Sequence, residues 1–491
     1  MPRWTDEQLE AINRSGQNII VSAGAGSGKT AVLTERVITK LKNGIHINQL
    51  LILTFTKAAA AEMKERIRKS IKKENLLEEL NYIDSAYITT FDSFSLSIVK
   101  KYHYLLNLDD NIGIAQASLV DIKRHEIMDE IFENMYQVGD AKFLNMIDTF
   151  CSKDDTSLRE SILTISKKLE LRYDLEDYLN NCLSESFNES TINKFVLEYE
   201  NLIEQKKNEI SDLTDDLIRM TDEKYSIKLG EYITPILEEY DLTNLLYKLD
   251  SSLPSLPRGS EEEVKKVKEL LASAITDLKS LVSYGDLEEI KSNIVGSKEF
   301  VEVIVSILKS YFKSLKEYKM NNKLYEFTDI ANFAIKILED NEEIREEIKY
   351  SFKEIMVDEY QDTNDIQELF IGMIANNNVY MVGDVKQSIY RFRNANPDIF
   401  RDKYNSYQKL DGGMKIDLLK NFRSRREVLF DINYIFNQIM SNDIGGADYS
   451  ESHQMVFGNT SYEEAGLTTQ NYQSSILEYQ LEGREYSKDE V

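Results

Sequence analysis

Short apolar runs alternate with helical patterns along residues 1–103. Each apolar run has the length of a buried strand, and the segment that follows it has apolar positions at helical spacing. Strands that alternate with helices pair in parallel, so this pattern predicts an α/β sheet with helices on both faces. The apolar runs are Asn18–Val21, Leu50–Thr54 and Ala86–Phe91, and the helical segments are Ala31–Leu41, Ala58–Ile67 and Phe94–Tyr104.

Between residues 104 and 320 the pattern is almost entirely helical. Glu and Lys dominate the polar positions, as in Glu262–Leu281, and a clear loop is indicated only around Pro254, Pro257 and Gly259. Charged residues at helical spacing most simply form the solvent-exposed faces of helices. We therefore expect residues 104–320 to be an all-helical insertion into one α/β domain.

The strand pattern returns after residue 321. Glu354–Asp358 and Val379–Asp384 have the pattern of buried strands, and Phe327–Ala331 opens a helix. A further apolar run, Met414–Leu418, is expected to start a second α/β domain. The expected limits are 1–103 and 321–400 for the first α/β domain, 104–320 for the insertion, 401–440 for the start of the second domain, and 441–491 for a polar tail without a clear element.

The charge of the chain qualifies any expectation of a nucleic-acid partner. The formal net charge is −26 over 491 residues, which on bulk charge alone argues against binding to nucleic acid. The charge is uneven, however, because residues 1–103 carry 15 Lys and Arg against 11 Asp and Glu. Binding to DNA would therefore depend on a local surface of the first domain.

Several features indicate a cytoplasmic protein. The only cysteines, Cys151 and Cys182, lack metal-ligand spacing, so they favour a reducing compartment without a zinc or iron–sulfur site. No run of about 18 uncharged apolar residues predicts a membrane span. The first residues, Met1–Asp6, lack the apolar core of a signal peptide.

A glycine-rich segment between the first strand and the first helix has the pattern of a phosphate-binding loop. Its glycines allow backbone N–H groups to converge on phosphate oxygens, and the following helix adds the positive end of its dipole. Its lysine can reach the β- and γ-phosphates, and its threonine can hold Mg²⁺. The alternative is a glycine-rich turn with a surface lysine. The segment is Ala23, Gly24, Ala25, Gly26, Ser27, Gly28, Lys29 and Thr30, with alanine where the strict pattern has its first glycine.

Two acids at the end of a later strand supply the chemistry that a phosphate-binding loop needs for hydrolysis. Asp358 is placed to hold Mg²⁺, and Glu359 can orient and deprotonate the attacking water. Alone, such a pair could be structural. Together with the loop, it predicts a nucleotide hydrolase.

The segment Gly383–Arg393 combines a polar amide with aromatic and basic residues. Gln387 follows a strand, where its amide could reach a γ-phosphate. Tyr390, Phe392 and Arg393 could stack on bases and pair with a nucleic-acid backbone. The alternative is a buried aromatic cluster, since most aromatic side chains lie in cores.

Taken together, these motifs resemble those of superfamily 1 DNA helicases of the UvrD/Rep type. Two details further resemble the AddA family of helicase–nuclease subunits. They are the sequence of Gly383–Arg393, which has Lys386 before Gln387, and the segment Ile416–Leu418 ahead of the last motif. The motifs, in the family's order, are Trp4–Gln8 (Q motif), Ala23–Thr30 (I), Thr54–Ala60 (Ia), Thr90–Ser93 (Ib), Asp358–Asp362 (II), Gly383–Arg393 (III) and Asn421–Ser424 (IV).

The resemblance implies a RecA-like motor domain, a parallel sheet with helices on both faces that is interrupted by the helical insertion and followed by the start of a second RecA-like domain. ATP and Mg²⁺ are the implied cofactors. The implied roles fall on Gln8 for reading adenine, Phe422 for stacking on it, the loop Ala23–Thr30 for the phosphates, Thr30 and Asp358 for Mg²⁺, Glu359 as the base, and Gln387 and Arg423 for the γ-phosphate.

The resemblance also implies translocation from 3′ to 5′ along single-stranded DNA, duplex DNA ends as substrate, and an AddB-like partner in double-strand-break processing. One position departs from the family, since Asp92 stands where many relatives have histidine, and a carboxylate would repel a DNA phosphate. The residues implied to contact DNA are Thr54, Phe55, Thr56, Lys57, Phe91, Tyr390, Phe392 and Arg393.

Motifs V and VI and the nuclease domain of the AddA family have no counterpart after Arg425. We therefore expect an N-terminal portion of such a helicase, impaired as an ATP hydrolase. The alternatives are a portion of a UvrD/PcrA-like repair helicase, or a non-catalytic DNA-binding module that keeps the fold.

Overall fold

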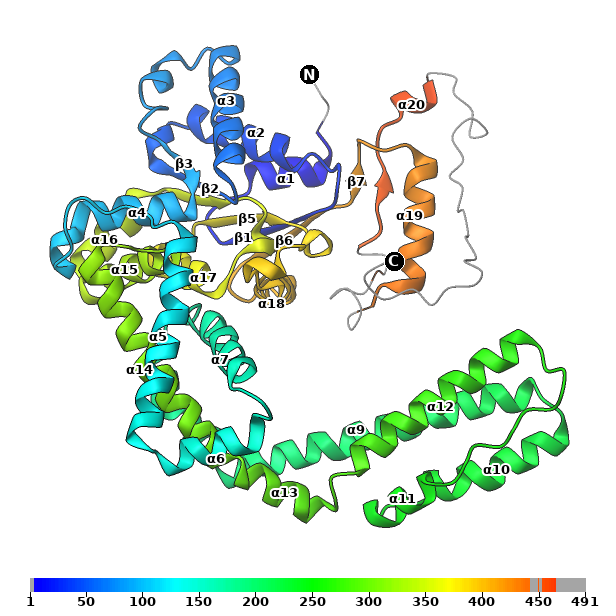
Figure 1. Cartoon of the computed structure of the whole chain (residues 1–491). Coiled ribbons are helices and arrows are strands. Elements are labelled where there is room, and N and C mark those ends of the chain that lie inside the picture. The colour runs from blue at the N-terminus through cyan, green and yellow to red at the C-terminus, as the bar shows by residue number, and fades with distance from the viewer. Residues whose placement is uncertain (1–3, 442–448, 450–452, 465–491) are drawn as a thin grey trace. The chain divides into compact units, whose positions relative to one another are not determined.

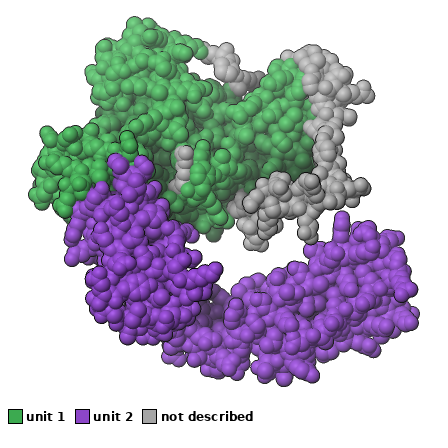
Figure 2. Space-filling model, viewed as in Figure 1, with its two compact units in different colours: residues 1–117, 170–173, 320–491 green, residues 118–169, 174–319 purple. Residues whose placement is uncertain are grey.

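The computed structural model describes residues 4–441, 449 and 453–464. It divides into two compact units, drawn in different colours in Figure 2. Unit 1 takes residues up to 117, residues 170–173 and residues from 320 onward, and unit 2 takes residues 118–169 and 174–319. The expected limits of the helical insertion were residues 104 and 320.

Unit 1 is built on a six-stranded sheet in which all neighbouring strands are parallel. The strand order is β3-β2-β4-β5-β1-β6. The predicted α/β fold with a parallel sheet is thereby confirmed. The strands are β1 (Ile19–Ala23), β2 (Leu50–Thr54), β3 (Tyr87–Thr90), β4 (Glu354–Val357), β5 (Val379–Gly383) and β6 (Met414–Leu418).

Helices cover both faces of this sheet, because alternate residues of each central strand point into different cores. Leu51 and Leu53 pack with one set of helices, and Ile52 between them packs with the other. One face carries α1 (Asp6–Asn13), α2 (Lys29–Lys42) and α3 (Lys57–Lys73); the other carries α4 (Phe91–Tyr102), α15 (Phe327–Asp340), α16 (Glu342–Ser351), α17 (Asp365–Ile374) and α18 (Pro397–Gln408) (Figure 1).

A buried ion pair ties α1 and α2 to the sheet. Arg36, which is fully buried, forms two hydrogen bonds of 3.0 and 2.5 Å with Glu354 at the start of β4. Its third contact is a 2.7 Å bond to the carbonyl oxygen of Ala11 in α1. A charge without water is tolerated only with such a complete set of partners. The pair therefore fixes where α1 lies relative to the strand that leads to Asp358.

The expectation that Met414–Leu418 opens a second domain is wrong. The strand β6 pairs with β1 in register from Ile19↔Met414 to Ala23↔Leu418, so it completes the first sheet. Ile416 packs in the same core as Val21. The apolar pattern predicted the strand correctly, but a pattern within one strand carries no information about its partner.

A small sheet follows the last strand of the large one. Here β7 (Lys420–Asn421) pairs in parallel with β8 (Val456–Phe457), and α19 (Arg426–Ile439) lies between them in the chain. A short helix, α20 (Ser461–Glu464), comes after β8. These last two elements correct the expectation that residues 441–491 contain no clear element.

The regular elements described in unit 2 are all helices, joined by loops such as residues 251–261. Its core joins α9 to α13 through fully buried leucines, among them Leu217, Leu245 and Leu271. Among the helices described in either unit, none has a stretch long and apolar enough to cross a bilayer. The helices are α5 (Ala117–Val138), α6 (Ala141–Phe150), α7 (Thr156–Leu169), α8 (Leu175–Ser186), α9 (Glu189–Arg219), α10 (Glu223–Leu237), α11 (Leu242–Leu249), α12 (Glu262–Val282), α13 (Leu287–Gly296) and α14 (Lys298–Asn322).

Candidate active site

The glycine-rich loop lies between β1 and α2 and has the geometry of a phosphate cradle. Gly26 and Gly28 adopt φ angles of +71° and +87°, which L side chains rarely adopt, and α2 begins directly afterwards at Lys29. The hydroxyl oxygen of Ser27 is buried and has no hydrogen-bond partner among the described residues. A buried polar atom without a partner is costly unless a ligand satisfies it. The loop therefore fits a phosphate group at the N-terminus of α2.

Gln8 lies against this loop, on the first turn of α1. Its backbone and side chain form a capping box with Thr5, with bonds of 3.2 and 3.0 Å. The side-chain nitrogen of Gln8 donates to the carbonyl oxygen of Ser27 at 3.0 Å. Gln8 thus supports the loop backbone directly, and its role in reading adenine remains a prediction.

Lys29 and Glu359 meet across the site. The lysine Nζ lies 2.9 Å from Oε2 of Glu359, and the side-chain amide of Gln361 donates to the same oxygen at 2.9 Å. An ammonium group has three donors, so this ion pair leaves two of them for phosphate oxygens. The predicted phosphate ligand and the predicted base therefore occupy one site.

The carboxyl group of Asp358, next to Glu359 in the chain, has a raised pKa. Burial, together with the nearby charge of Glu359, raises the pKa of Asp358 to about 6 despite the opposing effect of Lys29. Burial and Glu359 likewise raise the pKa of Asp362 to about 6. A divalent cation would favour the charged forms. Carboxylate and hydroxyl oxygens suit Mg²⁺, so the side chains of Asp358 and Thr30 have the donor chemistry that the predicted magnesium ligands need.

A chain of hydrogen bonds connects Glu359 to Gln387. Gln361 donates to Glu359 through its nitrogen and accepts from the backbone N–H of Asp384 through its oxygen, at 2.9 Å each. Asp384 in turn accepts from Gln387 at 2.7 Å and pairs with Lys386 at 2.8 Å. The predicted γ-phosphate ligand Gln387 is thereby linked to the predicted base.

Sequence reasoning missed Gln361 and Asp384 as members of the site. The signal that could have found them is Gly383, because a Cβ there would clash with the side-chain oxygen of Gln361. A glycine at the end of a buried strand, directly before a buried carboxylate, indicates such a close approach.

The predicted nucleotide residues of the last motif lie against the loop. The backbone N–H of Phe422 donates to the carbonyl oxygen of Gly26 at 2.9 Å. Asn421, which sequence reasoning had not assigned a role, donates from its side chain to the carbonyl oxygen of Ala25 at 2.6 Å. Arg423 follows directly, so the structure brings both predicted ligands, Phe422 and Arg423, to the loop.

Aromatic side chains form a row beside this site. The ring centroids of Phe55 and Tyr390 are 4.7 Å apart, and those of Tyr390 and Phe392 are 5.7 Å apart. Phe392 is 76% exposed. The predicted stacking residues are therefore adjacent, and they are not a buried core cluster. The backbone of Arg393 belongs to a short 3-10 helix, and its side chain lies outside the described residues.

The predicted DNA contacts next to Phe55 in the chain lie where β2 ends and α3 begins. Thr56 begins α3 as its N-cap and accepts from the N–H of Ala59, and Lys57 is exposed on the first turn. Thr54 is buried, and its hydroxyl donates to the carbonyl oxygen of Thr56 at 3.1 Å. These contacts hold Phe55 at the point where β2 ends.

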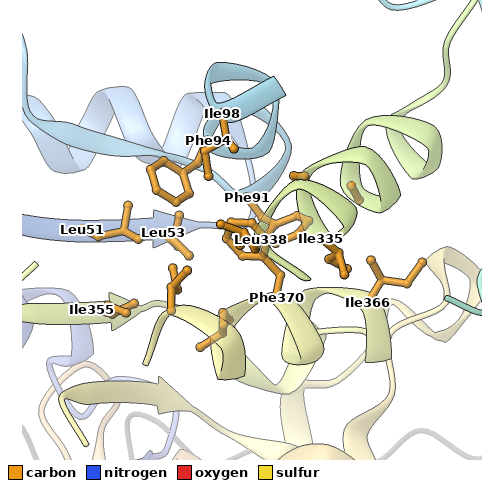
Figure 3. Packing of buried hydrophobic residues seen from close by; sticks show 14 of the residues in the cluster. Leu51, Leu53, Phe91, Phe94, Ile98, Ile335, Leu338, Ile355, Ile366 and Phe370 are labelled. Carbon is orange, nitrogen blue, oxygen red and sulfur yellow. The ribbon is translucent and has the colours of Figure 1, made fainter. Parts of the chain in front are cut away.

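Phe91 is a core residue, which corrects the prediction that it lies along DNA. Only 7% of it is exposed, and its ring meets Phe370 edge-to-face with centroids 5.1 Å apart. Figure 3 shows Phe91 among side chains of β2, α15 and α17, including Leu53 and Leu338. It is the first residue of α4, and this helix packs its apolar side onto the sheet.

A pocket of about 270 Å³ is lined both by residues predicted to contact DNA and by residues predicted to take part in hydrolysis. Its walls include Thr54 and Phe55 from the predicted DNA side, and Asp358 and Glu359 from the hydrolytic side. Asp92 also lines it, with a pKa raised by burial against the opposing effect of Lys57. The predicted DNA and nucleotide residues thus share one edge of the sheet.

Proteins of known name are similar in sequence to most of this chain. The chain is 34% identical to an ATP-dependent helicase/nuclease subunit (AddA) from Clostridium beijerinckii, over 93% of this chain and 41% of that protein. It is 33% identical to the protein of the same name from Clostridium novyi, over 97% and 42%, and 35% identical to that of Thermoanaerobacter sp., over 93% and 41%. The chain spans about two fifths of the length of these relatives.

The family model for the UvrD/REP helicase N-terminal domain matches residues 4–408. This range contains the phosphate-binding loop, the acids after β4 and the aromatic row. This match, together with the parallel sheet and the geometry of the site, shows that the chain belongs to the UvrD/REP helicase N-terminal domain family.

Proposed function

We propose that this chain is the motor part of an ATP-dependent DNA helicase that translocates 3′ to 5′ in the cytoplasm. It would belong to a helicase–nuclease complex that processes double-strand breaks, and its partners would be single-stranded DNA, a duplex end and an AddB-like protein. The observation that carries the proposal is the continuous set of bonds from Lys29 through Glu359 and Gln361 to Asp384 and Gln387. The names of the relatives, which describe a helicase/nuclease subunit, support it.

Each residue of the site has a task in this proposal. Thr30 and Asp358 would hold Mg²⁺, which neutralises phosphate charge during hydrolysis. Lys29 would bind the β- and γ-phosphates with the donors left free by Glu359. Glu359 would accept the proton of the attacking water, since Lys29 and Gln361 hold its carboxylate in place.

The DNA side of the proposal uses the aromatic row. Phe55, Tyr390 and Phe392 offer faces on which successive bases of a single strand can stack, independent of sequence. Tyr390 follows Gln387 by three residues, so a shift of the Gln387 amide on binding a γ-phosphate would be transmitted to the stacking surface.

Binding of Mg-ATP tests the proposal against a non-catalytic DNA-binding module. Isothermal titration should show binding by the unsubstituted chain and its loss, by at least about a hundredfold, in Lys29→Ala, because the phosphates lose their cation. Lys69→Ala, a change of a surface lysine on α3, should bind as the unsubstituted chain does. Binding of single-stranded DNA without any binding of ATP would favour the module instead.

A further inference from the structure

Asn421 holds the outer side of the phosphate-binding loop. Its side chain is buried, and its nitrogen donates to the carbonyl oxygen of Ala25 at 2.6 Å. Its side-chain oxygen accepts from the backbone N–H groups of Arg423 and Ser424, at 2.9 and 2.8 Å. One amide thereby joins the loop to the start of the segment that carries Phe422 and Arg423.

The geometry of the peptide bond gives this contact a consequence inside the loop. A trans peptide is planar, and its C=O and N–H groups point in opposite directions. Because Asn421 holds the carbonyl of Ala25 on the outer side, the N–H of Gly26 in the same peptide unit points away from Asn421. Backbone N–H groups that point inward are the donors with which such a loop binds phosphate.

The next peptide unit is fixed in the same way. The carbonyl oxygen of Gly26 accepts from the N–H of Phe422 at 2.9 Å, and the N–H of Ser27 bonds to the carbonyl oxygen of Gly24 at 3.1 Å. The fit is close, because a Cβ on Gly26 would lie 2.8 Å from both Arg423 Cβ and Asn421 Nδ2. Two consecutive peptides of the loop are therefore oriented from the side of Asn421.

We propose that Asn421 is a positioning residue for phosphate binding. Its amide orients the Ala25–Gly26 peptide from outside. It also links the loop to the Phe422–Arg423 segment, so that any change in the loop on binding triphosphate is passed to that segment. The proposal rests on the proposed function, since it specifies how the same site recognises the phosphates of ATP.

The variant Asn421→Asp isolates the donor. The aspartate keeps an oxygen that can accept from the N–H groups of Arg423 and Ser424, but places a second oxygen against the carbonyl of Ala25. We expect Mg-ATP to bind about tenfold more weakly or worse in isothermal titration. Inorganic tripolyphosphate, as a competitor, should lose affinity by the same factor, because the defect lies in the phosphate cradle and not in the adenine contacts.

The matched control is Asn459→Asp. Asn459 donates to the carbonyl oxygen of Phe422 at 3.1 Å, so it contacts the same segment through the same kind of bond, but not the loop. The affinity of Asn459→Asp for Mg-ATP should stay within about twofold of the affinity of the unsubstituted chain. Circular dichroism and thermal melts establish whether each variant is folded. If Asn421→Asp does not fold, Asn421→Ala replaces it, because alanine places no oxygen against the carbonyl of Ala25.

Equal affinity for Mg-ATP in folded Asn421→Asp and in the unsubstituted chain would overturn the inference. An equal loss in Asn459→Asp would overturn it too, because the effect would then belong to the segment in general. If the unsubstituted chain bound no Mg-ATP and Lys29→Ala made no difference, the proposed function itself would fail, which is a distinct result.

Discussion

Glu359 is held in a backbone conformation that few residues other than glycine adopt. Its φ angle is +51°, and its carboxylate faces Lys29 and Gln361. Such a conformation costs on the order of 1–3 kcal/mol and persists only where the surroundings enforce it. Here the left-handed turn directs the side chain from the end of β4 toward the phosphate-binding loop, which is what a base in this position requires.

Asp358 should make the stability of the chain depend on pH. Its pKa is raised from 3.8 to about 6, so between these values the folded chain binds a proton more readily than the unfolded chain. Stability must then fall as the pH rises through this window, and the charged form is unfavourable above it. Asp358→Asn should therefore increase the free energy of unfolding at pH 7.5 by about 2 kcal/mol.

Urea unfolding of both chains, without Mg²⁺, from pH 8 down to pH 5.5 measures this effect. The advantage of Asp358→Asn should shrink as the pH falls, because Asp358 becomes protonated in the unsubstituted chain. Asp362 titrates over the same range and is present in both chains, so its contribution cancels in the difference. A difference that is zero, or that does not change with pH, would contradict the assignment.

The strands β2 and β3 end in similar ways, but the phenylalanine that follows each strand lies in different surroundings. Each strand ends in a threonine whose hydroxyl makes a local bond, and each leads into a helix with a phenylalanine at the junction. Phe55 turns toward Tyr390, whereas Phe91 turns into the core beside Phe370. Phe55 is the residue proposed to stack on a nucleobase, and Phe91 stabilises the fold.

This separation predicts opposite effects of two alanine substitutions. Phe392→Ala, at the exposed end of the aromatic row, should weaken binding of single-stranded oligonucleotides by about fivefold or more with little change in stability. Phe91→Ala should lower the free energy of unfolding by about 3–5 kcal/mol through the cavity it leaves. Fluorescence anisotropy and urea unfolding separate the two. A selective loss of DNA affinity in folded Phe91→Ala would restore that residue to the DNA surface.

The elements that could be predicted from sequence are those whose signal is local. Strand, loop and helix around Lys29 are consecutive in the chain, and the acids follow β4 directly, so both halves of the site were predicted. The pairing of β6 with β1 and the bond from Asn421 to Ala25 join residues about 395 positions apart, and no local pattern encodes them. The burial of Phe91 depends on α15 and α17, which lie beyond the insertion.

In the whole molecule, the residues predicted to bind the nucleotide and DNA fall in one of the two units. The net charge of −26 opposes general binding to DNA, so the proposed affinity for DNA would depend on the aromatic row and on the exposed Lys57 that follows Phe55 closely in the chain. Every predicted nucleotide residue and every predicted DNA residue belongs to unit 1. We therefore propose that binding of ATP and binding of single-stranded DNA are coupled through the edge of a single sheet.

The most direct test measures the affinity of the chain for a single-stranded oligonucleotide with and without a saturating, non-hydrolysable ATP analogue and Mg²⁺. We predict that the analogue changes this affinity by about fivefold or more, the usual range of coupling between linked sites. Gln361→Ala, which breaks the bonds from Glu359 to Asp384, should bind both ligands but lose most of this change. If the unsubstituted chain had the same affinity for DNA with and without bound analogue, the proposed coupling would be contradicted.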